Sequence, residues 1–156
     1  MRSTVFVTGC LGNLGWKATL LLASDERFDR VIACDLEQPT EEQAEQLSVL
    51  PSVEFVRCDL SKWQDPRWRG RILDADMILH FAAKNPFPEA SWQDVAISMD
   101  ITNHITTALL ASEKPQRLVY ISSNHVMGRY KDSLFGKPDS AGGLRTDLEP
   151  GVGTIW

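Results

Sequence analysis

The stretch "TVFVTGCLGNLG", residues 4–15, decides the fold. It begins with a short apolar, β-branched run that predicts a buried strand over 4–8. Gly9, Gly12 and Gly15 follow at GxxGxxG spacing, and a segment that can be helical continues over 13–24. Glycine permits a tight turn, close approach of a pyrophosphate to the backbone, and close packing of the helix on the strand. The order strand, glycine turn, helix therefore predicts an anion-binding helix start of the kind that holds dinucleotides.

The rest of the chain repeats the alternation of apolar runs and helical segments. The further runs are near-continuous rather than alternating, which is typical of strands buried on both faces of a parallel sheet. The fold class is therefore predicted as α/β: a Rossmann-type doubly wound parallel sheet of about five strands, in order 3-2-1-4-5 with right-handed crossovers. The predicted strands are 30–35, 53–59, 76–83 and 117–123, and the predicted helices are about 40–49, about 62–73, and 92–112.

Two acidic residues end the second and third predicted strands. Asp35, 20 residues after Gly15, stands where a carboxylate can accept both hydrogens of an adenosine ribose diol. It would repel a 2'-phosphate, which favours NAD over NADP; the alternative is an acid that caps the next turn. Asp59 repeats the same Cys-Asp-Leu triplet and is predicted either to reach the adenine edge or to cap a turn. Leu36 and Leu60 follow the two acids, and Leu60 is expected to line the adenine pocket.

Composition and charge restrict the class of protein. The chain has 156 residues, 43% of them hydrophobic and 24% charged, which suits one globular domain. The net charge of -5 argues against a nucleic-acid partner. No apolar run approaches the roughly 18 residues of a membrane span and the start lacks signal-peptide character, so a cytoplasmic location is expected. Cys10, Cys34 and Cys58 lack CxxC spacing, which favours buried or half-buried thiols over disulfides or a metal site.

The last part of the chain differs from the rest. Residues 131–156, "KDSLFGKPDSAGGLRTDLEPGVGTIW", are rich in glycine and proline and show no clear periodicity. A structureless segment of this length is uncommon inside a compact domain. We therefore predict a Rossmann domain over 1–130, followed over 131–156 by a functional loop or the start of a truncated catalytic part.

The motifs resemble a known family, the extended short-chain dehydrogenases, also called the NAD-dependent epimerase/dehydratase family. The resemblance rests on "TGCLGNLG", Asp35, "DL" at 59–60, "HFAA" at 80–83 and "YISSNHVMG" at 120–128, which cover nearly the whole chain in order. Within the family, "SSNH" with a glycine three residues on resembles the uronate (hexuronic acid) dehydrogenases. The resemblance implies hydride transfer from a sugar or sugar acid, such as a hexuronate, to NAD.

The resemblance also implies roles for individual residues. Ser123 would be the catalytic serine that bonds the reacting sugar oxygen, Asn124 and His125 would hold substrate groups, and Asn85 is expected to help. Ser123 and His125 do not read as a hydrolase pair, because no strained G-x-S-x-G turn is evident. Asp100 and Asn103 both align with the family's helix asparagine. The cofactor-binding residues implied are Gly9, Gly12, Asn13, Leu14, Gly15, Asp35, Leu36, Asp59, Leu60, Phe81, Ala82, Ala83 and Ser122.

The sequence lacks the Tyr-x-x-x-Lys pair on which the family's chemistry depends. The two tyrosines, Tyr120 and Tyr130, are followed four residues later by Asn124 and Leu134. We therefore expect an N-terminal fragment that binds NAD without efficient turnover, with a fifth strand lacking its neighbour and a tendency to self-associate. Two alternatives stay open: a nucleotide-sugar epimerase or dehydratase, and a non-catalytic NAD-binding regulatory module.

Overall fold

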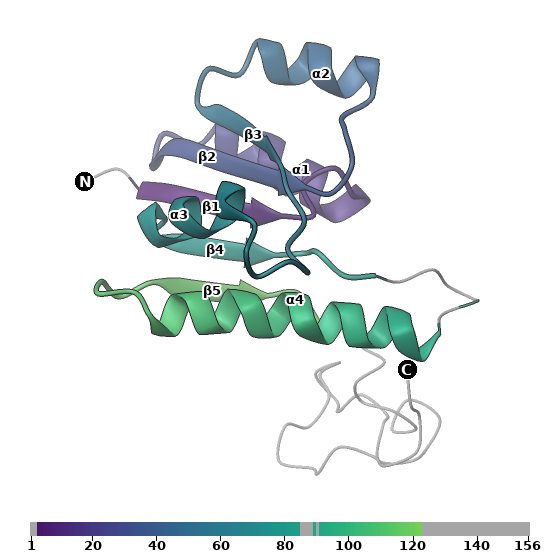
Figure 1. The fold of residues 1–156 in the computed structure, drawn as a ribbon. Helices are drawn as coiled ribbons and strands as arrows, with labels where there is room; N and C mark the ends of the chain where they lie inside the picture. The colour runs from purple at the N-terminus through teal and green to yellow at the C-terminus, as the bar shows by residue number, and fades with distance from the viewer. Residues whose placement is uncertain (1–2, 85–88, 90, 123–156) are drawn as a thin grey trace, which may run out of the picture. The chain divides into compact units, whose positions relative to one another are not determined.

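The computed structural model describes residues 3–84, 89 and 91–122. Its elements belong to one compact unit, Met1–Ile121. Five parallel strands form one sheet in the order β3-β2-β1-β4-β5, as predicted (Figure 1). The elements in chain order are β1 (Ser3–Thr8), α1 (Asn13–Ala23), β2 (Phe28–Asp35), α2 (Glu41–Ser48), β3 (Val53–Arg57), α3 (Pro66–Asp74), β4 (Met77–His80), α4 (Trp92–Leu110) and β5 (Arg117–Tyr120).

The centre of the sheet lies where the strand order reverses. β1 pairs with β2 on one side and with β4 on the other, so Thr8 is in register with both Cys34 and His80. Because all strands are parallel, the residues that follow β1, β2 and β4 emerge at the same edge. This is the switch point at which open α/β sheets bind their ligands.

The two faces of the sheet carry separate apolar clusters. Val5 and Val7 of β1 pack with Leu22 of α1, whereas Phe6 between them packs with the cluster that includes Ile72 of α3 and Ile105 of α4. Figure 1 shows α3 and α4 in front of the sheet and α1 behind it. Each such side chain stabilises the fold by about 1.5–3 kcal/mol through its burial, so the two clusters attach the helices to the two faces of the sheet.

The bounds of several elements differ from the predicted ones. The helix predicted over about 62–73 begins at Pro66, because the Asp65 carboxylate accepts the Arg67 N–H at 3.0 Å and proline suits the first helical position. The strands predicted over 76–83 and 117–123 end at His80 and Tyr120. The second strand begins at Phe28, where it already pairs with Ser3.

Two further predictions concern the fifth strand and the end of the domain. Within it, β5 has β4 as its one strand neighbour. The domain boundary predicted after residue 130 lies outside the described residues. No helix in the described ranges is long and apolar enough to cross a bilayer.

Candidate functional site

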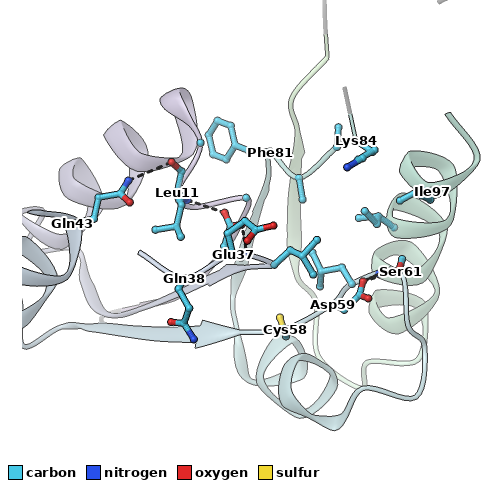
Figure 2. Close-up of a pocket in the computed structure, with 18 residues that line it drawn as sticks. Leu11, Glu37, Gln38, Gln43, Cys58, Asp59, Ser61, Phe81, Lys84 and Ile97 are labelled. Carbon is cyan, nitrogen blue, oxygen red and sulfur yellow. Dashed lines mark hydrogen bonds between the residues drawn. The ribbon is translucent and has the colours of Figure 1, made fainter. Parts of the chain in front are cut away.

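A cavity of about 640 Å³ lies at the carboxyl edge of the sheet (Figure 2). Its size is in the range of small-molecule and cofactor sites, which is about 300–1,000 Å³. Many of the residues predicted to bind a cofactor line it: Gly9, Gly12, Asp35, Leu36, Asp59, Leu60, Phe81, Ala82 and Ala83. The sequence did not predict cofactor contacts for the other lining residues, which are Leu11, Glu37, Gln38, Gln43, Cys58, Ser61, Lys84, Ile97 and Ile101.

The three glycines of the first turn have different functions. Gly9 adopts a positive φ of 66°, and a Cβ there would lie 2.9 Å from the Ala82 Cα. A Cβ on Gly15 would lie 2.1 Å from the Gly9 carbonyl oxygen, so only glycine lets the helix pack against the turn. A Cβ on Gly12 would meet the same oxygen at 3.4 Å, an ordinary contact. Gly9 and Gly15 therefore shape the turn, whereas Gly12 keeps the backbone beside the cavity bare.

Helix α1 begins at this turn without a side-chain cap. Gly12 is its N-cap residue, and its first turn carries no acidic side chain. Among the described residues, no acceptor bonds the N–H groups of Asn13 and Leu14, whose side chains are exposed and do not line the cavity. Free N–H groups and the positive end of the helix dipole make this start a place for an anion.

Asp35 connects the end of β2 to the glycine turn. One carboxylate oxygen accepts the Leu11 N–H at 2.9 Å, and the other accepts the Glu37 N–H at 3.2 Å. Each carboxylate oxygen has two acceptor positions, so both can still accept hydroxyl groups from the cavity. The Leu11 carbonyl is 3.4 Å from the Gln43 side-chain nitrogen of α2, as Figure 2 shows. Asp35 thus bonds the turn that follows its strand, as the alternative prediction has it, and also lines the cavity. Its bond to a ribose stays a prediction.

Asp59 caps a turn and also lines the cavity. One of its carboxylate oxygens accepts the N–H and the hydroxyl of Ser61, at 3.0 and 2.6 Å, and the other is 3.4 Å from the Lys62 ammonium. Partial burial opposes ionisation, but these bonds outweigh it and hold the pKa of Asp59 below its usual range. With Asp35 and Glu37 it places three carboxylate side chains on the cavity wall.

Comparison with known proteins agrees with this geometry. Residues 5–146 match the NAD dependent epimerase/dehydratase family. The chain belongs to that family. No curated protein matches the chain.

Solved structures similar to this chain share its fold. A short chain dehydrogenase family protein from Francisella tularensis is 19% identical, with a TM-score of 0.56 over 80% of this chain and 52% of that one. The Bacillus cereus UDP-glucuronic acid 4-epimerase, crystallised with NAD, is 19% identical, with a TM-score of 0.69 over 94% and 45%. Bordetella bronchiseptica WbmH, in complex with NAD+, is 21% identical, with a TM-score of 0.67 over 97% and 46%. This family member therefore spans about half the length of these structures.

The segment after β4 approaches the glycine turn and is held by hydroxyl groups. The Thr8 hydroxyl oxygen is 3.1 Å from both the Phe81 and the Ala82 nitrogens, and the Ser98 hydroxyl oxygen is 2.9 Å from the Lys84 nitrogen. Thr8 also bonds the buried ring of His80. The sequence motif "HFAA" identified the lining residues of this segment but not the histidine or the threonine that hold it.

Burial determines the protonation of His80. The ring is 1% exposed, and burial lowers the pKa of His80 to about 4. The imidazole is therefore neutral at neutral pH. His80 also contacts the Tyr120 ring of β5, at 5.6 Å between ring centres.

The three cysteines are buried free thiols, as predicted. Burial and the nearby Asp35 charge raise the pKa of the Cys10 thiol, and a hydrogen bond with Cys58 together with burial raises that of Cys34. Both thiols therefore stay protonated and unreactive. Cys58 lies at the cavity wall and is 2% exposed.

Several predicted site residues cannot be placed against the cavity. Ser123, Asn124, His125 and Asn85 lie outside the described residues. Ser122 is exposed and does not belong to the compact unit Met1–Ile121. The catalytic and substrate roles that the resemblance implies for these residues stay predictions.

Proposed function

We propose that the chain binds NAD in the cavity at the carboxyl edge of the sheet and belongs to an oxidoreductase acting on a sugar or sugar acid. The observation that supports this most directly is the conjunction of an uncapped helix start with a carboxylate at the end of the next strand. Gly12 is the N-cap residue of α1 and provides no side-chain cap, and both Gly12 and Asp35 line the same cavity. These are the two groups that a dinucleotide requires, one for its pyrophosphate and one for its ribose.

The residues present fit that cofactor. The start of α1 would hold the pyrophosphate, Asp35 the adenosine ribose, and Leu60 with Asp59 the adenine. Ala82 and Ala83 have small side chains that leave room beside the backbone of the Phe81–Lys84 segment. When bound, NAD supplies a nicotinamide ring that accepts or returns hydride.

The substrate proposal rests on the "SSNH" motif. We infer that Ser123 bonds the reacting sugar oxygen and that Asn124 and His125, with Asn85, hold hydroxyl or carboxylate groups of a hexuronate. The sequence contains no Tyr-x-x-x-Lys pair to take the substrate proton, so we expect the 156-residue chain to bind NAD without reducing it. Rapid formation of NADH from a hexuronate by this chain would contradict that expectation.

Calorimetric titration of the whole chain with NAD and with NADP tests cofactor binding. We expect NAD to bind and NADP to bind at least about tenfold more weakly, because Asp35 and Glu37 repel a 2'-phosphate. The variant Asp35→Asn should weaken NAD binding and narrow the difference between the two cofactors. Glu37→Gln is the matched control, since it removes a charge from the same wall without altering the bond to Leu11. Failure to bind either dinucleotide would refute the proposal.

The competing functions differ in what happens to the reduced cofactor. A dehydrogenase releases NADH, an epimerase or dehydratase retains it through the cycle, and a regulatory module never forms it. We therefore expect NAD-loaded protein to bind a hexuronate in preference to a UDP-hexose, as followed by amide chemical shifts in NMR titrations. Tighter binding of the nucleotide sugar would favour the epimerase alternative.

A further inference from the structure

A line of hydrogen bonds connects the cavity wall to α4 through the middle of the protein. It begins at the backbone of Phe81 and Ala82, passes through Thr8 of β1 and His80 of β4, and ends at Thr102 of α4. Thr8 is fully buried and His80 is 1% exposed, so water does not compete for the bond between them. Buried polar groups arranged in this way are costly unless every member is satisfied.

The chemistry of the groups determines the direction of the bonds. The Phe81 and Ala82 N–H groups can only donate, so the Thr8 oxygen accepts both, at 3.1 Å each. The Thr8 hydroxyl hydrogen is then left to donate, and it points to His80 Nδ1 at 2.7 Å. Nδ1 is therefore the acceptor, and the proton of the neutral ring resides on Nε2.

The far side of the ring continues the same direction. His80 Nε2 is 3.1 Å from the Thr102 hydroxyl, which donates in turn to the Ser98 carbonyl at 3.0 Å. Every donor along the line thus points from the cavity wall toward α4. The line is consistent with only one neutral tautomer, since a proton on Nδ1 would oppose the Thr8 hydroxyl hydrogen.

We propose that His80, in its Nε2–H tautomer, is a positioning residue for the dinucleotide: it orients Thr8 so that the backbone of Phe81 and Ala82 keeps its place at the cavity wall. This inference rests on the proposed function, because the wall is where the cofactor would lie. The same segment is fixed on its other sides by Gly9, whose close approach to Ala82 leaves no free space, and by the Ser98 hydroxyl on Lys84. A rotation of the Thr8 side chain would release the Ala82 N–H, whereas the Phe81 N–H would keep its bond to the Thr8 main-chain carbonyl at 3.2 Å.

Nitrogen NMR of the whole chain with labelled histidine tests the tautomer without any substitution. His80 should show the Nε2–H pattern. His104 provides an internal reference of the opposite kind, because its Nδ1 is 2.8 Å from the Leu60 carbonyl, which can only accept. The spectrum of His80→Asn assigns the His80 signals among the three histidines. An Nδ1–H pattern for His80 would overturn the proposal.

Two pairs of variants test the positioning. His80→Asn puts an amide oxygen close to the place of Nδ1 and should keep NAD affinity within about threefold of wild type, whereas His80→Phe removes the acceptor and should weaken it at least about tenfold. Thr8→Ser keeps the hydroxyl, and Thr8→Val, of nearly the same shape, removes it. We expect Thr8→Ser to keep NAD affinity, as His80→Asn does, and Thr8→Val to weaken it, as His80→Phe does. Thermal unfolding without NAD identifies any variant that fails to fold.

The outcomes separate this proposal from the one on which it rests. If the wild-type chain binds no NAD, the proposed function fails and the cofactor role of His80 fails with it. If the wild type binds NAD and folded Thr8→Val binds it equally well, the positioning role alone is overturned. Loss of stability in equal measure for Thr8→Ser and Thr8→Val would also overturn it, because the hydroxyl would then not matter.

Discussion

Helices α1 and α4 begin in opposite ways. The start of α4 is closed by its own side chains: the Ser91 hydroxyl accepts the Asp94 N–H at 3.3 Å, and the Asp94 carboxylate accepts the Ser91 N–H at 2.9 Å. Helix α2 has the same kind of capping box, formed by Thr40 and Gln43. The start of α1 has Gly12 in the capping position and no acidic residue in its first turn.

The capped helix start contributes to stability, whereas the uncapped start of α1 leaves groups free for binding. A capping box satisfies the free N–H groups of a helix start and contributes about 1 kcal/mol to stability. At α1 that contribution is absent, although the backbone of Gly12 has the extended conformation that a capping serine also adopts. Gly12, directly before the residues whose N–H groups are free, lines the cavity, and the anionic part of a ligand bound at this helix start can satisfy those groups. The weaker local start is therefore consistent with a site that a cofactor completes.

The largest effect is expected where the glycine turn leaves no room. Gly15→Ala would bring a methyl group to 2.1 Å from the Gly9 carbonyl, which is backbone and cannot move aside cheaply. We expect the free energy of unfolding to fall by about 3 kcal/mol or more and NAD binding to be lost. Urea denaturation and calorimetry measure the two. Gly70→Ala on α3 is the matched control, since nothing lies within 4 Å of its new Cβ, and should stabilise the chain slightly.

The next largest effect is the dependence of stability on pH that the buried ring of His80 causes. The folded pKa of His80, about 4, lies below the ordinary 6.5, so between these values protons bind preferentially to the unfolded chain. The contribution of His80 is thus fully present above about pH 6.5 and is lost as the pH falls toward about 4, by up to about 3 kcal/mol.

Urea denaturation of wild type and His80→Asn across that range checks this expectation. The asparagine variant does not titrate there, so its stability should fall less. The pKa values of Asp94, bonded by Ser91, and of Asp25, bonded by Arg27, are also lowered. Those carboxylates lose their contribution at lower pH in both proteins and cancel in the comparison. Parallel curves for the two proteins would contradict the buried, neutral assignment of His80.

An intermediate effect is expected from giving α1 the cap that it lacks. Gly12→Asp fits its extended backbone, and its carboxylate can accept the free N–H groups of the first turn. We expect the chain without cofactor to gain a few tenths of a kcal/mol and NAD affinity to fall at least about tenfold, because a fixed negative charge occupies the place of the pyrophosphate. Gly12→Asn separates charge from size. Unchanged NAD affinity in Gly12→Asp would show that the start of α1 does not hold the cofactor.

The sequence predicted the sheet because its strands are continuous apolar runs that differ sharply from their surroundings. Gly9 and Gly15 were also predicted from a local pattern, because their spacing reflects a steric requirement of the backbone. The start of α3 was placed too early, because residues 62–65 are compatible with a helix, whereas the cap at Asp65 and the proline at Pro66 determine the boundary. These two signals for a helix start were outweighed by the longer helix-compatible pattern around them.

The buried residues that hold the cavity wall were harder to predict than the residues that line the cavity. Asp35 was found because it follows a strand at a fixed distance from the glycine turn. Thr8 and His80 carry the same positional information, at the ends of β1 and β4, but a buried hydrogen bond between them depends on strand register, which pairs Thr8 with His80 across 72 positions of sequence. The Thr102 contact depends further on how α4 packs on the sheet. Such partners follow from tertiary packing and have no local pattern.

The smallest expected effect comes from the closed helix start. Ser91→Ala removes one half of the capping box of α4 and should lower the free energy of unfolding by about 1 kcal/mol, because the Asp94 N–H then loses its acceptor. NAD affinity should stay within about twofold of wild type, since Ser91 does not line the cavity. Ser91→Thr keeps a capping hydroxyl and serves as the control in urea denaturation and calorimetry. The result that would break the comparison between the two helix starts is a loss of NAD affinity in Ser91→Ala that matches the loss in Gly12→Asp, because a cap that served only its own helix could not affect the cavity.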